Sequence, residues 1–532
     1  MQHEAARTVP ARWVARRVDE LVSALDSTAP FLIAGLFGIG VLLVLSFVPW
    51  GQNADDLLPT IMSLQKITLY FWEQNRFGNL LPALTAWIAD PTQNAWAQIV
   101  LRVAAGMVAP LFFTAMIFPR ASDAWRAALA ADGLLLWAGD PALLREIFLV
   151  ASPYGTSLAC GGLAMLALGH AWRRPLGCRL ECPLGWQRGA WAAAGSVGLL
   201  AAHVVNYALA MVAIPMLGLF AVLLPSAARM RVLVLNGGAA LVAFALPAAF
   251  APYYPTPMGM HLSWEGLGRF QSAIWGSTGW VFAVAAVAPV VLALVAFRFG
   301  AVKRSAKPFA VSLLAGAATA VVSFVLIAAS EHVRLNQYHP RYFLPILMLV
   351  LAVGGVAVWQ VLRLMTPARI VRNALFMVVA VLMLMGARGH LMASGDRTPD
   401  IVGFGKADLA RSVAIRYGVL SLDAIAGDYW DVWPSVFMTE QYHRDTGWTG
   451  ADVLGVAHRS RARRDVFLAR LLARGRLRLV CIDMEPEACV RYAVIAMAVP
   501  GLRGQAFAPS EAVGGGHTLY YVEIAPPPLS PP

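Results

Sequence analysis

Long apolar runs recur along the first 388 residues of the chain. Eleven of them approach the roughly 20 residues that a helix needs to cross the hydrocarbon core of a bilayer. They lie at about 31–48, 97–118, 124–139, 147–169, 189–204, 207–225, 231–249, 279–297, 308–329, 343–364 and 373–388. Residues 189–225 suit a hairpin that turns near His203, Asn206 and Tyr207 better than one bent helix. The pattern predicts an α-helical polytopic membrane protein with about eleven transmembrane helices in residues 1–388.

The chain beyond residue 388 has a different pattern. Helical spacing of apolar residues covers 406–417, 433–442 and 465–473, and strand-like runs cover 421–426, 477–482 and 518–524. These elements predict a small C-terminal α/β domain over about 395–526, followed by a Pro-rich tail, 527–532. Cys481 and Cys489 fall in this domain, where they could form a disulfide or remain two buried thiols.

Positive charge is unevenly divided between the two sides of the predicted bundle. With the N-terminus inside, the inner segments hold 19 Lys and Arg residues, whereas the outer loops before the tail hold 7. Cytoplasmic loops of membrane proteins retain Lys and Arg, so we expect a cytoplasmic N-terminus. An odd number of spans then places the C-terminal domain outside the cytoplasm.

Composition excludes several classes of protein. Of the 532 residues, 59% are hydrophobic and 14% are charged, and the mean hydropathy is +0.63. A soluble protein carries roughly 25% charged residues, so this chain cannot be an ordinary cytosolic enzyme, a disordered chain or a collagen. The net charge of +12 follows from the loops that flank apolar runs. We therefore expect the lipid bilayer, and no nucleic acid, as a partner.

The first outer loop, residues 49–96, is too long to be a simple connector, and long structured loops are usually functional. It opens with Asp55 and Asp56, and two amphipathic stretches follow that we expect to lie in the membrane interface. Transfer of a sugar from a lipid phosphate would need a carboxylate at the membrane surface that accepts the proton of the acceptor hydroxyl as a general base. At most one of the two is the base, because adjacent side chains point in different directions. The other could bind a metal or cap the next helix, and helix capping alone could also explain both residues.

The second and the fourth outer loops also carry candidate polar residues. Asp140 is either a second active-site acid or part of an Asp-Pro turn. His261 and Arg269 are candidate substrate-binding residues, although a solvated helix face explains them as well.

The fifth outer loop is the strongest candidate site for binding an anion. Arg341 stands at the outer mouth of a predicted span, where its guanidinium can bind a phosphate through two hydrogen bonds. Tyr338 and Tyr342 would shield the site and help to seat a lipid, and His339 stands close to Arg341 in the sequence. The alternative is that Arg341 and the tyrosines simply anchor the helix in the membrane interface.

This layout resembles the GT-C superfamily of polytopic glycosyltransferases. The likeness rests on one span followed by a long outer loop that opens with Asp-Asp, and on the segments RFGNLLP (76–82), RYFLP (341–345) and GDYWDVWP (427–434). The resemblance implies that Asp55 or Asp56 is the catalytic acid, that Asp140 is a second one, and that Arg341, helped by His339, binds the donor phosphate. Some members use a divalent metal ion and others do not, so the cofactor stays open.

The resemblance also implies an activity and a location. The protein would be a glycosyltransferase of the bacterial inner (cytoplasmic) membrane that takes a sugar from a polyprenyl-phosphate-linked donor. The acceptor, a glycan, a glycolipid or a protein, would be met on the periplasmic face, where the C-terminal domain would also lie. The chain lacks a WWDYG-type motif, which argues against transfer of an oligosaccharide block onto Asn.

Two other functions compete with this one. A transporter or flippase of lipid-linked oligosaccharides would bury ionisable residues within its spans. The spans here carry few charges, of which Asp132 is the clearest, while polar residues gather on one face, and this asymmetry favours chemistry at the membrane surface. An O-antigen polymerase would share the membrane and the class of substrate, but it would not need a soluble C-terminal α/β domain.

Overall fold

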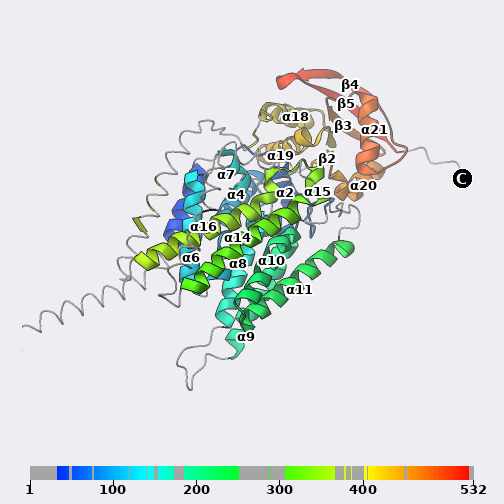
Figure 1. The fold of residues 1–532 in the computed structure, drawn as a ribbon. Coiled ribbons are helices and arrows are strands. Elements are labelled where there is room, and N and C mark those ends of the chain that lie inside the picture. The colour runs from blue at the N-terminus through cyan, green and yellow to red at the C-terminus, as the bar shows by residue number, and fades with distance from the viewer. Residues whose placement is uncertain are drawn as a thin grey trace, which may run out of the picture.

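The computed structural model describes residues 33–46, 51–74, 77–118, 120–138, 141–148, 154–172, 185–250, 306–365, 401–403, 405–448 and 452–526, together with residues 287, 291, 377, 378, 381 and 385. A helical bundle forms the first part of the chain, and a small domain with a sheet is stacked on one end of it (Figure 1). The mostly helical protein with a small C-terminal sheet is as the sequence predicts.

Helices overlap nine of the eleven predicted apolar runs. They are Ile33–Ser46, α4 (Pro91–Val108), α5 (Leu111–Ile117), α6 (Ala121–Ala138), α8 (Tyr154–Ala171), α9 (Gly185–Val205), α10 (Ala210–Leu223), α11 (Ala227–Phe250), α14 (Ala306–Ala328) and α16 (Leu344–Met365). Among the described residues, four helical segments are long and apolar enough to cross a membrane: Pro91–Ile117, Ala227–Phe250, Phe309–Ala328 and Arg341–Arg363. The runs at 279–297 and 373–388 lie almost entirely outside the described residues, so the count of eleven stays a prediction.

The chain reverses between α9 and α10, as the hairpin requires. Asn206 is extended and caps a single 3₁₀ turn, η2 (Tyr207–Leu209), through a hydrogen bond from the Ala208 amide at 3.1 Å. The end of α9 meets the first outer loop, where Asn206 and Phe77 form an isolated antiparallel β-bridge. The far end of α11, at Phe250, meets the same loop, so α10 runs away from this side of the bundle and α11 returns to it.

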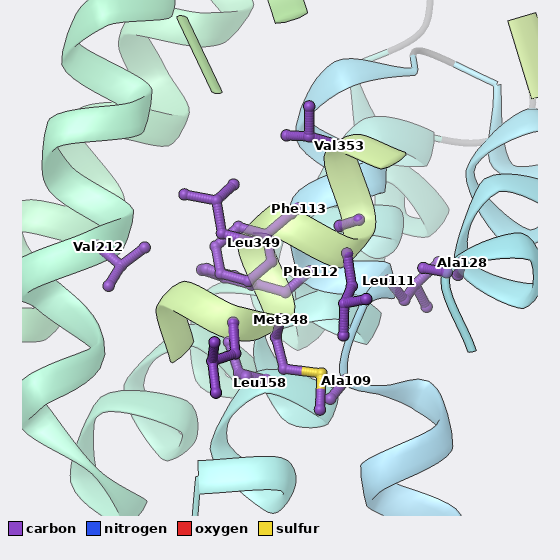
Figure 2. Close-up of a cluster of buried hydrophobic side chains, with 14 of the residues drawn as sticks. Ala109, Leu111, Phe112, Phe113, Ala128, Leu158, Val212, Met348, Leu349 and Val353 are labelled. Atoms are coloured by element: carbon purple, nitrogen blue, oxygen red, sulfur yellow. The ribbon is translucent and has the colours of Figure 1, made fainter. Parts of the chain in front are cut away.

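The core of the bundle is built around α16. Met348, Leu349 and Val353 of this helix lie among Phe112 and Phe113 of α5 and other apolar side chains (Figure 2). Helix α16 also packs closely against α6. A Cβ at Gly355 would stand 2.2 Å from the Ala127 carbonyl oxygen and 2.7 Å from the Ala131 nitrogen, so only glycine allows the two backbones to approach this far.

The C-terminal domain contains a five-stranded sheet in the order β2-β1-β3-β5-β4. The central strands β1 (Ala424–Ala426), β2 (Leu454–Val456) and β3 (Leu477–Ile482) are parallel, and β5 (His517–Ala525) and β4 (Arg503–Val513) add antiparallel. The helices are α18 (Ala407–Val419), α19 (Tyr429–Thr446), α20 (Arg464–Arg474) and α21 (Pro486–Met497), with 3₁₀ turns η5 (Ser460–Arg463) and η6 (Gly514–Gly516). The sequence pattern missed β2, α21 and β4. Cys481 and Cys489 form a disulfide, which settles the alternative left open by the sequence.

The first outer loop is covered by the C-terminal domain. It contains α2 (Ala54–Gln65) and α3 (Leu80–Thr85), and α2 packs against α19 (Figure 1). Leu57, Leu58 and Ile61 of α2 are fully buried in a cluster that also holds Trp433 of α19. Protein, and not lipid, therefore covers the apolar face of α2, which differs from the interfacial position expected for this stretch. The apolar residues of α2 pack against side chains of α19 in the C-terminal domain.

Candidate functional site

The two adjacent acids of the first outer loop occupy different environments because successive residues of a helix point about 100° apart. Asn53 caps α2, and Asp56 is the third residue of the helix. Asn53 Oδ1 accepts a hydrogen bond from the Asp56 amide, and Asp56 Oδ2 accepts one from the Asn53 amide, both at 3.1 Å. This reciprocal pair is a capping box, so Asp56 is oriented inward and Asp55 to the side.

Asp56 is a buried, neutralised residue. Its side chain is 0% exposed and lies 3.3 Å from Arg145 Nη2 and 3.8 Å from Arg102 Nη1. Arg102 is itself buried and donates to the Asp56 carbonyl oxygen at 3.1 Å and to Gln52 at 3.1 Å. Through these contacts Asp56 links α2 to α4 and to α7 (Pro141–Phe148). Its carboxylate is not exposed to solvent.

Asp55 has its carboxylate at the junction between the two domains. Tyr429 of α19 donates its hydroxyl to Oδ1 at 2.6 Å, and Arg459 Nη1 lies 3.2 Å from the same oxygen. From the other side, Arg341 Nη1 lies 3.5 Å from Oδ2. The side chain keeps 19% of its surface exposed. Asp55, and not Asp56, is therefore the acid that a substrate can reach.

The electrostatic balance at Asp55 favours the ionised form. Burial by itself would raise the pKa of Asp55, but Arg459, the hydrogen bond from Tyr429 and Arg341 outweigh it and hold the pKa below its ordinary value. Burial raises the pKa of Tyr429 far above its usual range, so its hydroxyl stays a donor. One carboxylate between two guanidinium groups leaves this spot with a net positive charge, which suits an anionic ligand.

Arg341 is the first residue of a helical segment, Arg341–Arg363, that is long and apolar enough to cross a membrane. It lies in the 3₁₀ turn η4 (Pro340–Phe343), which leads directly into α16. Its Nη2 lies 3.3 Å from the Tyr342 hydroxyl, and its guanidinium carbon lies 5.2 Å from the centre of the Tyr342 ring. His339 Nδ1 accepts from the Arg341 amide at 3.4 Å, and burial together with Arg341 lowers the pKa of His339. Tyr338 is buried in the core of the bundle.

The structure brings Asp55, Arg341, His339 and Tyr342 together, and it adds residues that sequence reasoning missed. Tyr429 lies in the GDYWDVWP segment, which contributed to the family resemblance but not to the predicted site. Arg459 follows β2, a strand that the sequence pattern did not predict. Glu146 of α7 also faces this site. Burial raises the pKa of Glu146, despite the opposing influence of Arg341, and its Oε2 is buried without a hydrogen-bond partner among the described residues.

Three candidates from the sequence are not placed by the structure. Asp140, His261 and Arg269 lie outside the described residues. Glu146 is the acid of the second outer loop that the described residues bring near Asp55, six positions after Asp140.

The described surroundings of Asp55 do not fit a divalent metal ion. Both carboxylate oxygens already face cationic groups, and a metal of this kind needs several oxygen ligands directed at one point. Within the described chain, Asp431, Asp483 and His517 do place ligand atoms within 4.8 Å of one another. Lys406 Nζ, however, lies 2.5 Å from Asp431 Oδ1, and His517 Nδ1 lies 2.6 Å from Asp483 Oδ2, so groups of the protein already engage these ligand atoms.

Comparisons with solved structures return several similar chains. The chain is similar to ArnT from Cupriavidus metallidurans in the apo state, with 14% identity, a TM-score of 0.48, and coverage of 94% of this chain and 98% of that one. It is also similar to the arabinofuranosyltransferase AftD from Mycobacteria (14% identity, TM-score 0.44, 93% and 40% covered). The oligosaccharyltransferase from Archaeoglobus fulgidus follows (12% identity, TM-score 0.42, 77% and 64% covered).

These three structures share 12–14% identity with this chain. No protein-family model and no curated protein sequence matches it. At these identities the likeness concerns the arrangement of the chain alone, so an activity has to be argued from the residues around Asp55.

Proposed function

We propose that this protein is an integral membrane glycosyltransferase that moves a sugar from a polyprenyl-phosphate-linked donor to an acceptor hydroxyl on the periplasmic face of the bacterial inner membrane. One observation carries the proposal. A partly exposed carboxylate, Asp55, lies 3.5 Å from a guanidinium, Arg341, that stands where a membrane span begins. A lipid-linked sugar phosphate needs both groups side by side at the surface of the bilayer.

The chemistry follows from these two groups. The acceptor oxygen attacks the anomeric carbon of the donor sugar while Asp55 takes the hydroxyl proton as general base. The bond from the anomeric carbon to the phosphate oxygen breaks, and the phosphate leaves with the bonding electron pair. Arg341 stabilises that growing negative charge through a guanidinium that can donate two parallel hydrogen bonds. The lipid tail stays in the bilayer throughout, which is why the site has to lie at its edge.

The lowered pKa of Asp55 makes it a weak base in the free protein, and donor binding would correct this. A phosphate bound to Arg341 would compete with Asp55 for the guanidinium and would bring negative charge close to the carboxylate. Both effects raise the pKa of Asp55 toward the value that a general base needs. Tyr429 and Arg459 would keep the carboxylate in place while Arg341 turns to the phosphate. The acid would thus become basic only when a donor is present.

The position of the C-terminal domain supports the proposed sidedness. Its residues Tyr429 and Arg459 contact Asp55 directly, so the tail and the first outer loop share one side of the membrane. The excess of Lys and Arg in the opposite loops favours the periplasm for this side.

Turnover of defined donors tests the proposal. The purified protein, reconstituted in lipid, is incubated with a panel of polyprenyl-phosphate sugars, and release of polyprenyl phosphate is measured for wild type and Asp55→Asn. Asp408→Asn is the matched control, because Asp408 is an exposed acid of α18 whose side chain is 83% accessible. We expect the Asp55 variant to lose about 10²–10⁴-fold in turnover and the control to keep it. Transbilayer movement of the donor without its consumption would instead indicate a flippase.

A further inference from the structure

A cavity of about 640 Å³ lies beside the Asp55 site, between the first outer loop and the C-terminal domain. Four aromatic side chains line it: Tyr70, Phe71 and Trp72 from the loop, and Phe250 from the end of α11. Leu468 of α20 adds a further apolar surface. Phe71 and Trp72 are only 7% and 1% exposed and belong to the core behind the cavity, so Phe250 and Leu468 supply its open apolar surface.

Most of the charged groups at the cavity already have partners. Lys66 Nζ lies 3.1 Å from Asp465 Oδ2 and donates to the Ala462 carbonyl oxygen at 2.9 Å. Glu73 accepts a hydrogen bond from the Arg461 amide. These groups form the frame of the cavity, and they leave little charge of their own for a ligand.

Two polar groups at the cavity are not used by the described residues. The Tyr70 hydroxyl is buried without a hydrogen-bond partner, although the residue is only 3% exposed. A buried hydroxyl in this state costs free energy unless a ligand or water satisfies it. Burial also raises the pKa of Tyr70 to about 12, so the hydroxyl remains protonated and can donate. Arg464 lines the same cavity with an exposed guanidinium that forms no ion pair or hydrogen bond within the described chain.

The cavity is joined to the catalytic acid through one side chain. Gln74 lines the cavity, and its amide oxygen, turned toward Arg459, accepts from Nη2 at 2.7 Å and from Nε at 3.2 Å. Arg459 in turn lies 3.2 Å from Asp55 Oδ1. Phe250, which ends an apolar helix long enough to cross a membrane, brings the opposite wall to the level of the bilayer surface.

We propose that this cavity is the acceptor subsite and that it takes an acidic saccharide, with a sugar ring against Leu468 and the acidic group between Arg464 and the Tyr70 hydroxyl. This inference rests on the proposed function and names the class of its second substrate. A saccharide seated here would reach toward Asp55 along the Gln74–Arg459 contact. The donor, bound at Arg341, would approach Asp55 from the other side.

Binding of a matched pair of small glycosides tests the cavity without turnover. The probes are 4-nitrophenyl β-D-glucuronide and the neutral 4-nitrophenyl β-D-glucoside, titrated into the full-length protein in nanodiscs and followed by saturation-transfer NMR. We expect the glucuronide to bind at least tenfold more tightly, because a charge-assisted hydrogen bond from a guanidinium is worth about one decade in affinity or more. Arg464→Gln should abolish this preference. Tyr70→Phe should weaken glucuronide binding about three- to tenfold.

Arg491→Gln is the matched control, since Arg491 is an exposed arginine on α21 of the same domain, 71% accessible, and does not line the cavity. It should bind both probes as wild type does. Equal affinity of wild type for the two probes, or an unchanged preference in Arg464→Gln, would overturn the proposal. A third probe, dodecyl β-D-glucuronide, separates free from lipid-linked acceptors. Phe250→Ala weakens binding of this probe alone if the acceptor carries a lipid.

The cavity and the catalytic proposal can fail separately. In the Asp55→Asn background the glucuronide should still bind, because the probe does not depend on the base. If Asp55→Asn abolishes transfer while the glucuronide shows no preference, the cavity proposal alone is wrong. If Asp55→Asn keeps full transfer, the catalytic assignment is wrong whatever the probes show.

Discussion

Replacing Asp56 by Asn should destabilise the protein, whereas replacing its neighbour Asp55 by Asn should spare the fold and remove transfer. Asp56 is fully buried and faces Arg102 and Arg145 at 3.8 and 3.3 Å. Removing one partner of a buried ion pair costs about 3–5 kcal/mol, because the opposite charge stays buried without compensation. Domains are stable by only about 5–15 kcal/mol, so this loss is a large share of the total.

The assay separates stability from activity. Thermal unfolding of each purified variant in the same detergent should show a marked decrease in Tm for Asp56→Asn and a small change for Asp55→Asn. Transfer per folded molecule should fall about 10²–10⁴-fold for Asp55→Asn, which corresponds to about 3–5 kcal/mol in the activation barrier. Adding Arg102→Gln to Asp56→Asn removes the buried charge that has lost its partner, so the double variant should regain part of the lost Tm.

Two results would refute this reasoning. A Tm for Asp56→Asn equal to that of wild type would mean that the buried ion pairs contribute nothing to the fold. A folded Asp56→Asn protein without transfer, beside an active Asp55→Asn protein, would exchange the roles assigned to the two acids.

Three further predictions follow from the same geometry. Arg341→Ala should raise the donor KM and lower kcat more than Arg341→Lys does, because Lys keeps the charge but loses the paired hydrogen bonds; equal effects in donor kinetics would leave Arg341 as an interface anchor. Tyr429→Phe removes a bond that lowers the pKa of Asp55, so the loss of activity on acidification should begin at a higher pH than in wild type, as a pH–rate profile would show. A reporter fused after Asp396 should be active as alkaline phosphatase, which requires the periplasm; activity of a cytoplasm-only reporter there would reverse the topology.

The sequence predicted where helices occur in the first part of the chain, because the signal for an apolar helix is local. A run of apolar side chains long enough to cross a bilayer is visible in any window of the chain, and nine of the predicted runs overlap helices. The strands of the C-terminal domain were harder to predict. Strand β2 has three residues, which is too short for a periodic pattern, and β4 is broken by bulges and largely exposed.

Only part of the candidate site could be predicted, because its residues lie far apart along the chain. Asp55 and Arg341 were named because each stands next to an apolar run, and the structure places their side chains 3.5 Å apart. Their roles depended on partners that the first outer loop does not contain. Asp56 has a structural role because it pairs with Arg102 and Arg145. Asp55 accepts a hydrogen bond from Tyr429, which lies 374 positions further along the chain. No local pattern around residue 55 carries that information.

The same contacts explain which interactions hold the two domains together and which ones shape the site. Burying each of Leu57, Leu58, Ile61 and Met62 against the tail is worth roughly 1.5–3 kcal/mol, so this face of α2 can supply most of the docking energy. The Asp55–Arg459 pair cannot, because the Coulombic gain of a partly buried ion pair is largely cancelled by desolvation of its charges. The apolar face of α2 therefore docks the C-terminal domain. Once the domain is docked, Tyr429 and Arg459 meet Asp55 in one fixed geometry, and the carboxylate is oriented at no further cost.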